Sequence, residues 1–229
     1  MALTFAGVVL DLDGLLLDTE RLQAQTGPEV LREFGYAVEQ GFFHRLVGLD
    51  HDEATRLINH ELGANLDSVA LEEAWNGIID RHMQDEMPLR PGVHRFFDAL
   101  DAHGLPRSIA TNSVTAKAEW KLRRAGLFDR VNAVVGVDQV SRGKPAPHVY
   151  IEGARRLGLS PEHCVALDDS DLGVRSAIAA GISTVIQVPD MTPSRERLAH
   201  HQVESLDDAL CLLGLGDKPG DSATGRHGK

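Results

Sequence analysis

The chain has 229 residues, of which 42% are hydrophobic and 25% charged, and a formal net charge of -11 at pH 7. This composition predicts a packed core, and the negative charge disfavours a nucleic acid or an acidic membrane as partner. No apolar segment reaches membrane-spanning length and the N-terminus lacks a charged signal-peptide start, so we expect a cytoplasmic protein. The sequence leaves the oligomeric state open, and a monomer is preferred.

The predicted elements change in character along the chain. Residues 4–10 are expected to form an apolar strand, and residues 19–87 to form helices only, with Gly27-Pro28 interrupting the first one. Beyond Pro88, strands are expected at residues 107–110, 133–137, 163–167 and 183–188, with helices between them. This alternation predicts an α/β fold with a Rossmann-like parallel sheet flanked by helices.

The same change sets the expected domain boundaries. Residues 1–18 and 88–213 would form the core domain, and residues 19–87 an inserted all-helical cap domain. Residues 214–229 are rich in glycine and polar residues and are expected to form a disordered tail.

Two aspartates follow the first predicted strand, in the run Asp11-Leu12-Asp13-Gly14. The carboxyl ends of strands are where open α/β sheets form their sites. Two carboxylates there can share a metal ion, and one can act as a nucleophile while the other transfers a proton. The alternative for these residues alone is an acidic pair in an ordinary turn.

Two further candidate groups are polar or basic. Thr111-Asn112-Ser113 follows the strand at 107–110 and suits a phosphoryl oxygen, although Ser113 could simply cap the next helix. Lys144 stands between glycine and proline, so it is either placed for a site or an ordinary surface lysine in a turn.

The last candidate group is again acidic. Asp168 and Asp169 end an apolar strand and would repel each other unless a cation lay between them. Ser170 or Asp171 could serve only to cap the following helix.

Each of the four groups lies at the end of a predicted strand or in the loop after it. In this order they closely resemble the four motifs of the haloacid dehalogenase (HAD) superfamily, most of whose members are Mg²⁺-dependent phosphatases. The sequence departs mildly from the family at Leu15 and at Asp168, where close relatives usually have Glu. The helical segment after the first motif is similar to the cap of the phosphoglucomutase-like subfamily, which includes small-metabolite phosphatases and β-phosphoglucomutase.

The resemblance implies hydrolysis of a small phosphorylated metabolite, such as a sugar phosphate, through an aspartyl-phosphate on Asp11. Asp13 would be the general acid and base, and Thr111 and Lys144 would hold the phosphoryl group. The residues implied for the Mg²⁺ site are four acids: Asp11, Asp13 through its main-chain carbonyl, Asp169, and Asp168 nearby. Those implied to contact the substrate are Asn112, Glu20, Gln23 and His51, with the loop 46–51.

Two alternatives stay open at this point: an isomerase of the β-phosphoglucomutase type, and a catalytically silent HAD-fold binding protein. Dehalogenases of the superfamily lack the second acid, which is present here as Asp13. The β-phosphoglucomutases have a histidine shortly after the first motif and a cap arginine, and those places hold Gln23 and His51 in this chain. Hydrolysis is therefore preferred to isomerisation.

Overall fold

The computed structural model describes residues 4–46, 51–191 and 193–216. Part of the predicted substrate loop, residues 47–50, and most of the predicted tail, residues 217–229, lie outside these ranges. Among the described residues, no helix combines the length and the apolar character that a membrane span needs.

Six parallel strands form one sheet in the order β3-β2-β1-β4-β5-β6. The first strand lies in the middle because the chain runs outward from it in one direction and then returns to its other side. The strands are β1 (Gly7–Leu10), β2 (Arg107–Ala110), β3 (Ala133–Val135), β4 (Cys164–Asp168), β5 (Thr184–Gln187) and β6 (His201–Gln202). The first strand begins at Gly7, three residues after the start predicted at residue 4.

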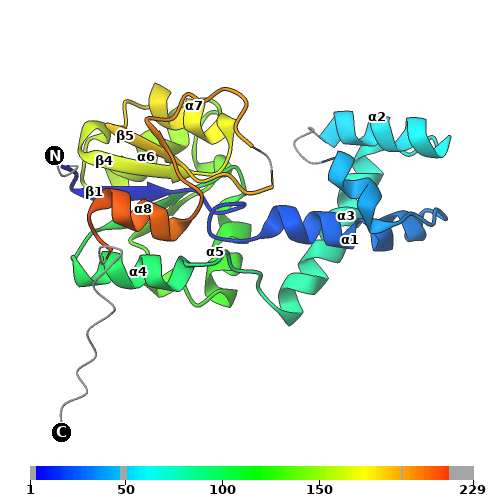
Figure 1. Cartoon of the computed structure of the whole chain (residues 1–229), viewed down its shortest axis with the longest axis horizontal. Coiled ribbons are helices and arrows are strands. Elements are labelled where there is room, and N and C mark those ends of the chain that lie inside the picture. The colour runs from blue at the N-terminus through cyan, green and yellow to red at the C-terminus, as the bar shows by residue number, and fades with distance from the viewer. Residues whose placement is uncertain (1–3, 47–50, 192, 217–229) are drawn as a thin grey trace, which may run out of the picture.

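Helices cover both faces of this sheet (Figure 1). Val8 and Leu10 point into one apolar cluster and Val9 into the other, because successive side chains of a strand face opposite sides. The predicted α/β fold with a Rossmann-like sheet is confirmed. The first cluster is closed by α4 (Val93–Ala102), α5 (Thr115–Arg124) and α8 (Leu206–Leu213), and the second by α6 (His148–Arg156) and α7 (Asp171–Ala179). Short 3-10 turns are η2 (Phe128–Arg130), η3 (Val137–Gln139) and η4 (Pro161–His163).

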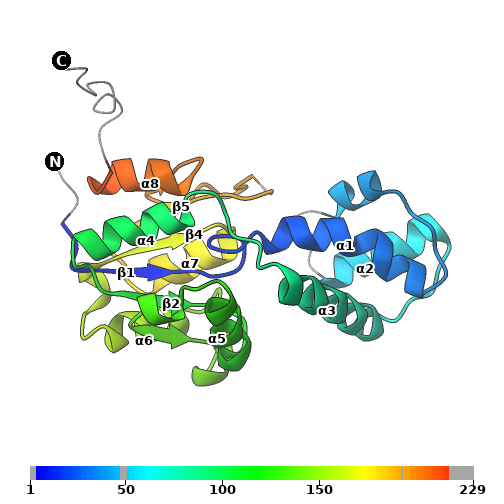
Figure 2. The same cartoon turned by 90° about the horizontal axis from the view of Figure 1, so that it is seen from below.

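Residues 19–85 form a separate group of helices, which we call the helical unit. It consists of α1 (Thr19–Glu33), η1 (Gln40–Arg45), α2 (His51–Leu62) and α3 (Ser68–Asp85). It has its own apolar core, built around Phe43, Ile58, Leu71 and Trp75. Both views show it beyond the edge of the sheet at which β1 ends (Figures 1 and 2).

The predicted interruption of the first helix at Gly27-Pro28 is wrong, because α1 runs through Pro28 without a break. Proline removes one helical hydrogen bond, so packing must hold this part of the helix. Gly27 supplies a close contact: a Cβ atom there would lie 2.2 Å from Cε1 of Phe43. Tertiary contacts therefore outweigh the local effect of the proline.

The helical unit is joined to the sheet by two chain crossings that lie side by side. The N–H of Asp18 donates to the carbonyl of Pro88 at 2.9 Å, and that of Arg90 to the carbonyl of Leu16 at 3.0 Å. Leu17 and Leu89 form an isolated antiparallel bridge between these bonds. The two crossings thus form one connection.

Candidate active site

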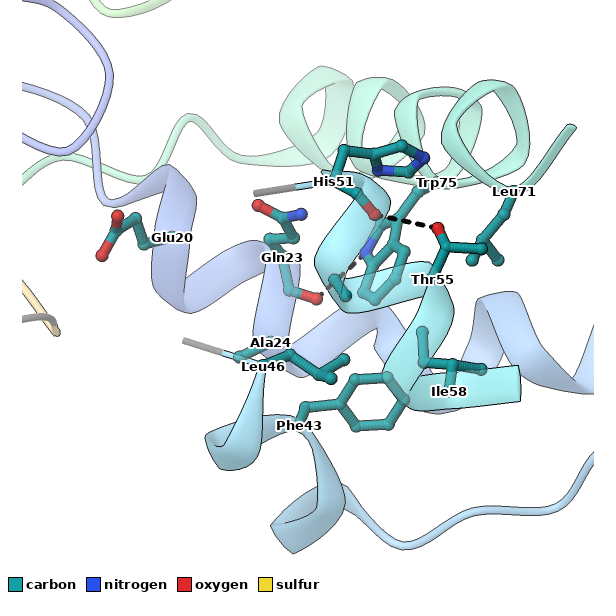
Figure 3. A pocket seen from close by; sticks show the side chains of 11 residues that line it. Glu20, Gln23, Ala24, Phe43, Leu46, His51, Thr55, Ile58, Leu71 and Trp75 are labelled. Carbon is teal, nitrogen blue, oxygen red and sulfur yellow. Dashed lines mark hydrogen bonds between the residues drawn. The ribbon is translucent and has the colours of Figure 1, made fainter. Parts of the chain in front are cut away.

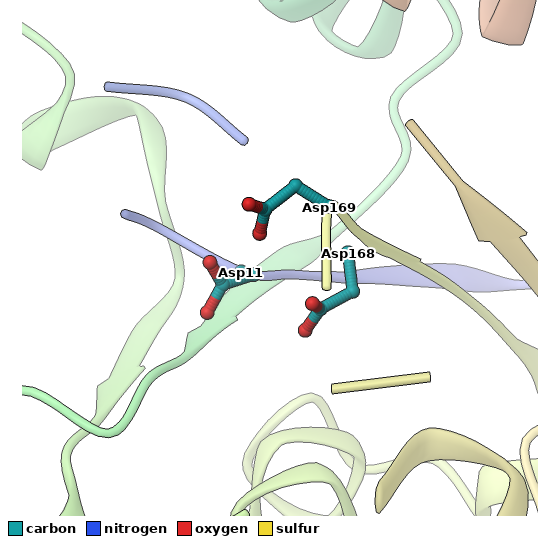
Figure 4. Close-up of side chains that lie close together, drawn as sticks. All are labelled: Asp11, Asp168 and Asp169. Carbon is teal, nitrogen blue, oxygen red and sulfur yellow. The ribbon is translucent and has the colours of Figure 1, made fainter. Parts of the chain in front are cut away.

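Three aspartates meet where β1 and β4 end. The two strands are parallel neighbours with Leu10 opposite Leu167, so Asp11 and Asp168 lie next to each other and Asp169 follows. One carboxylate oxygen from each of these aspartates lies within 4.8 Å of the others (Figure 4). All three side chains belong to buried residues, with exposed fractions of 8% or less. The structure therefore brings together the acids that the sequence placed at two separate strand ends.

Lys144 lies inside this acidic cluster. Its Nζ is 2.7 Å from Oδ2 of Asp168 and forms a second ion pair with Asp11. The alternative of an ordinary surface lysine is therefore wrong. The side chain of Asn112 holds the main chain of the lysine, since its Oδ1 accepts from the Lys144 N–H at 2.7 Å and its Nδ2 donates to the Lys144 carbonyl at 3.3 Å.

The cluster carries more negative than positive charge in a buried place. Burial raises the pKa of Asp11 to about 7, although Lys144 acts in the opposite direction. Burial and the charges of Asp168 and Asp11 raise the pKa of Asp169 well above its usual range. Burial alone would lower the pKa of Lys144, but the two neighbouring carboxylates raise it. One ammonium does not balance three carboxylates, so the site suits a further cation.

Asp168 differs from the other two acids because its oxygens are already occupied. Oδ1 accepts hydrogen bonds from the N–H and the hydroxyl of Ser170, at 2.9 and 2.8 Å. Oδ2 accepts from Lys144 and from the hydroxyl of Tyr150, at 2.7 and 2.6 Å. No described residue donates a hydrogen bond to the Asp169 carboxylate. Asp11 and Asp169 are therefore better placed than Asp168 to bind a hard cation through oxygen, as Mg²⁺ requires.

A tight turn after β1 places Asp13. The N–H of Gly14 donates to the carbonyl of Leu17 at 2.8 Å, and Gly14 has a φ of 86°. A Cβ atom at Gly14 would also lie 2.2 Å from Oδ2 of Asp169. Glycine is needed here both for the backbone conformation and for the close approach of the acid.

Asp13 is held by two side chains from the segment after β2. Lys121 Nζ donates to Oδ1 at 2.6 Å, and the Ser113 hydroxyl donates to Oδ2 at 2.8 Å. The alternative of Ser113 as a helix cap is wrong, because Val114 is the N-cap of α5. Thr111 is buried beside them, and its hydroxyl oxygen accepts from the Ser113 N–H at 3.0 Å. In the fourth group, by contrast, Ser170 does cap α7 in addition to holding Asp168.

Sequence reasoning missed Lys121. It stands on the buried stripe of α5, three residues after Ala118 and one before Leu122, and is itself only 5% exposed. A lysine at an apolar position of an amphipathic helix is a usable signal, because buried lysines need a partner. The sequence did not show that the partner is Asp13, 108 residues earlier.

The three predicted substrate residues of the cap lie around a cavity in the helical unit. Glu20, Gln23 and His51 line this cavity of about 180 Å³ together with Leu46 (Figure 3). Burial raises the pKa of Glu20, although the nearby main chain of Met191 and the charge of Arg90 act in the opposite direction. The other cap residues predicted for substrate binding, 47–50, lie outside the described residues.

Comparison with known proteins gives consistent results. A family model described as haloacid dehalogenase-like hydrolase matches residues 8–187. The chain is 32% identical over 183 residues to fructose-1-phosphate phosphatase YqaB of Escherichia coli (strain K12), covering 79% of this chain and 95% of that protein. It is 31% identical over 214 residues to (DL)-glycerol-3-phosphatase 2 of Arabidopsis thaliana, covering 88% and 87%. A crystal structure of a HAD family hydrolase from Deinococcus radiodurans R1, with bound phosphate and sodium, superposes with a TM-score of 0.77 at 27% identity, covering 93% of this chain and 97% of that one.

Proposed function

Because the chain belongs to the haloacid dehalogenase-like hydrolase family, we propose that it is a Mg²⁺-dependent phosphatase acting on a small phosphomonoester through an aspartyl-phosphate. The observation that carries the proposal is the position of Asp11. Its buried carboxylate lies beside the Lys144 ammonium and the two acids at the end of β4, Asp168 and Asp169, with Asp13 two residues away. A nucleophile, a proton-transfer group and a cation for the phosphate are thus available at one edge of the sheet.

In the first step, an oxygen of Asp11 attacks phosphorus, and the bond from phosphorus to the leaving oxygen breaks. Asp13 donates a proton to that oxygen, so the product leaves as an alcohol. In the second step, Asp13 accepts a proton from water, the water oxygen bonds to phosphorus, and the bond to Asp11 breaks. Free phosphate and the original carboxylate result. Lys121 and Ser113 support this role because they hold both oxygens of Asp13 in place.

Lys144 and Thr111 would bind the phosphoryl oxygens. The ammonium of Lys144 offsets negative charge that develops during transfer, and the buried Thr111 hydroxyl and neighbouring N–H groups orient the oxygens. Asp168 contributes by fixing the lysine, since it accepts one of its hydrogen bonds at 2.7 Å.

The donor set fits Mg²⁺, which prefers oxygen ligands. Asp11, the main-chain carbonyl of Asp13 and Asp169 would hold the ion, with Asp168 behind them. When bound, Mg²⁺ supplies positive charge that neutralises the phosphoryl oxygens and the attacking carboxylate. The raised pKa values of Asp11 and Asp169 support this assignment, because a cation would stabilise both charges.

We also propose that residues 19–87 act as a cap domain over the site, with the paired crossings at Leu17 and Leu89 as the hinge. Closing the cap would exclude water during the first step and place the leaving group. The expectation of a cytoplasmic monomer stays a prediction.

The decisive experiment measures phosphate release from p-nitrophenyl phosphate, a phosphomonoester, with and without Mg²⁺. We expect release that needs the metal, and its loss in Asp11→Asn, because an amide is a poor nucleophile. Asp129→Asn changes an exposed aspartate on η2 and is the matched control. Asp169→Ala should need more Mg²⁺ for the same rate. An active Asp11→Asn variant would contradict the mechanism, and no release at all would favour the silent binding protein.

The isomerase alternative requires a separate test. The described residues around the cavity include no lysine or arginine that would hold a second phosphate, which favours hydrolysis. The enzyme is given β-glucose 1-phosphate with a trace of the 1,6-bisphosphate. Free phosphate should appear, whereas faster formation of glucose 6-phosphate would establish the mutase instead.

A further inference from the structure

Tyr150 on α6 is completely buried and connects the apolar core with the catalytic acids. Its side chain belongs to the second apolar cluster, which also contains Val9 of β1 and Ala110 of β2. Helix α6 packs against both of these strands. The tyrosine ring therefore takes its position from the two strands that lead into Asp11 and Thr111.

The hydroxyl of Tyr150 lies among the polar groups of the site. It donates a hydrogen bond to Oδ2 of Asp168 at 2.6 Å, and the same oxygen accepts from Nζ of Lys144 at 2.7 Å. A hydrogen bond of this length from a hydroxyl to a carboxylate is a strong one. Tyr150 and Asp168 each have an exposed fraction of 0%, so water does not replace the hydroxyl. The hydroxyl thus fixes the direction in which Asp168 presents Oδ2 to the lysine.

The ring of Tyr150 also contacts the ammonium directly. Nζ of Lys144 is 5.1 Å from the centroid of the ring, which is within the range of a cation–π contact. An ammonium has three N–H groups, and that of Lys144 forms ion pairs with Asp11 and Asp168. Two carboxylates and one ring therefore surround the ammonium, and one N–H remains for a phosphoryl oxygen.

Asp11 and Asp168 share this one ammonium, but their roles differ. Asp11 must keep an oxygen free to attack phosphorus, whereas Asp168 makes no covalent bond in either proposed step. If Asp168 turned away, Lys144 would bind Asp11 alone. Oδ1 of Asp168 is held by Ser170. Among the described residues, Tyr150 is the one neutral donor that holds Oδ2, the oxygen that faces the lysine.

We propose that Tyr150 is a positioning residue of the phosphatase, which acts through Asp168 to hold the Lys144 ammonium where the phosphoryl group binds. The inference rests on the proposed function, since it concerns the same reaction. The competing interpretation is that the hydrogen bond only satisfies a buried hydroxyl. In that case its loss would change stability and leave the reaction as it is.

The test removes the hydroxyl and keeps the ring, by the substitution Tyr150→Phe. The chain has one other tyrosine, Tyr36, which is half-buried against the core of the helical unit, and Tyr36→Phe is the matched control. Hydrolysis of p-nitrophenyl phosphate at saturating Mg²⁺ gives kcat and KM for each protein. Misplacing a catalytic group by about 1 Å can cost about 10²-fold, so the smaller displacement in Tyr150→Phe should lower kcat by at least about fivefold. KM should change by less than about twofold, and Tyr36→Phe should match the unaltered protein.

The comparison of kcat with KM and with stability separates the two interpretations. If Tyr150→Phe lowers the free energy of unfolding in urea but keeps kcat within about twofold, the hydroxyl is only structural and the inference is wrong. A rise in KM at constant kcat, or an equal loss of kcat in Tyr36→Phe, would overturn it as well. An active unaltered protein with an equally active Tyr150→Phe variant contradicts this inference alone. No phosphate release by the unaltered protein would overturn the proposed function and this inference with it.

A double-variant cycle tests whether the hydroxyl acts through Asp168. Asp168→Ala removes the acceptor of the hydrogen bond, so adding Tyr150→Phe to it should lower kcat by less than about twofold. An added loss as large as that of Tyr150→Phe alone would show that the tyrosine acts by another route. If Asp168→Ala does not fold, the kcat and KM of Tyr150→Phe decide by themselves.

Discussion

The ammonium of Lys144 and the carboxylate of Asp168 form a buried ion pair, with 2.7 Å between Nζ and Oδ2. Lys144 lies in the loop before α6 and Asp168 is the last residue of β4, and each also has a role in the proposed mechanism. The ion pair therefore stabilises the folded site, and its lysine also supplies positive charge for the phosphate.

Lys144→Met should lower the free energy of unfolding by about 3–5 kcal/mol at about pH 8, because it leaves buried carboxylates without their cation. The double variant Lys144→Met/Asp168→Asn should lose less free energy of unfolding than Lys144→Met alone, because one of the unpaired charges is then removed. Urea unfolding in EDTA measures both. If both variants lose the same free energy of unfolding, the interaction between Lys144 and Asp168 does not contribute to stability.

Lys121 is expected to act on catalysis by positioning Asp13. Lys121→Met should lower kcat by at least about tenfold with little change in KM, and Lys121→Arg should restore part of the rate. Asp13→Ala, which removes the acid itself, should lose about 10² to 10⁴-fold. Arg123→Met changes an exposed cation on the same helix and is the control. If Lys121→Met changes only stability and leaves kcat as it is, the positioning role is wrong.

Metal binding and stability should depend on pH through Asp11. Its pKa is raised from 3.8 to about 7 in the folded protein, so between these values the folded state holds more protons than the unfolded state. The free energy of unfolding of the metal-free protein should therefore fall as pH rises through this window. Since Mg²⁺ competes with the proton, the increase in Tm on adding Mg²⁺ should be larger at about pH 8 than at about pH 5.

Thermal unfolding with EDTA or Mg²⁺ at the two pH values checks this expectation. Asp11→Asn removes the titrating group and should reduce both the pH dependence and the difference between the two Mg²⁺ effects. An equal Mg²⁺ effect at both pH values in the unaltered protein would mean that Asp11 does not compete for the metal.

Gly173 lets the first turn of α7 lie against Asp168. A Cβ atom at Gly173 would come within 1.7 Å of Oδ2 of Asp168, so Gly173→Ala must displace that carboxylate and with it Lys144. We expect a loss of activity of at least about tenfold and a lower Tm. Gly77 lies inside α3, and a Cβ atom there would meet no described atom within 4 Å, so Gly77→Ala should stabilise by about 0.5–1 kcal/mol. Full activity in Gly173→Ala would contradict the positioning of Asp168.

The residues of the site that lie at strand ends were predictable, because each candidate group is a short run of neighbouring residues in the sequence. A buried apolar run that ends in acids is visible in the sequence, and parallel strands bring such ends to one edge. The contact of Lys121 with Asp13 was not predictable in this way, since it depends on how α5 packs against the sheet. The same holds for Asn112, whose side chain binds the main chain of Lys144.

Two elements near the C-terminus were missed for different reasons. Helix α8 follows Ser205, whose hydroxyl accepts from the Asp208 N–H at 3.1 Å, and this spacing of serine and acid is a usable sequence signal. Strand β6 has only two residues, too few to show alternation. The continuous helix through Pro28 shows the opposite case, in which a clear local signal is overruled by packing against Phe43.

The two crossings between the sheet and the helical unit are hydrogen-bonded to each other, with Asp18 N–H 2.9 Å from the Pro88 carbonyl. The ends of the insertion therefore meet, and the entropy of closing a loop with fixed ends grows only slowly with its length. Insertions of different size could replace residues 19–87 without altering the order of the strands. Evolution could thus exchange the part that recognises the leaving group as a module, while the phosphate chemistry of the sheet stays as it is.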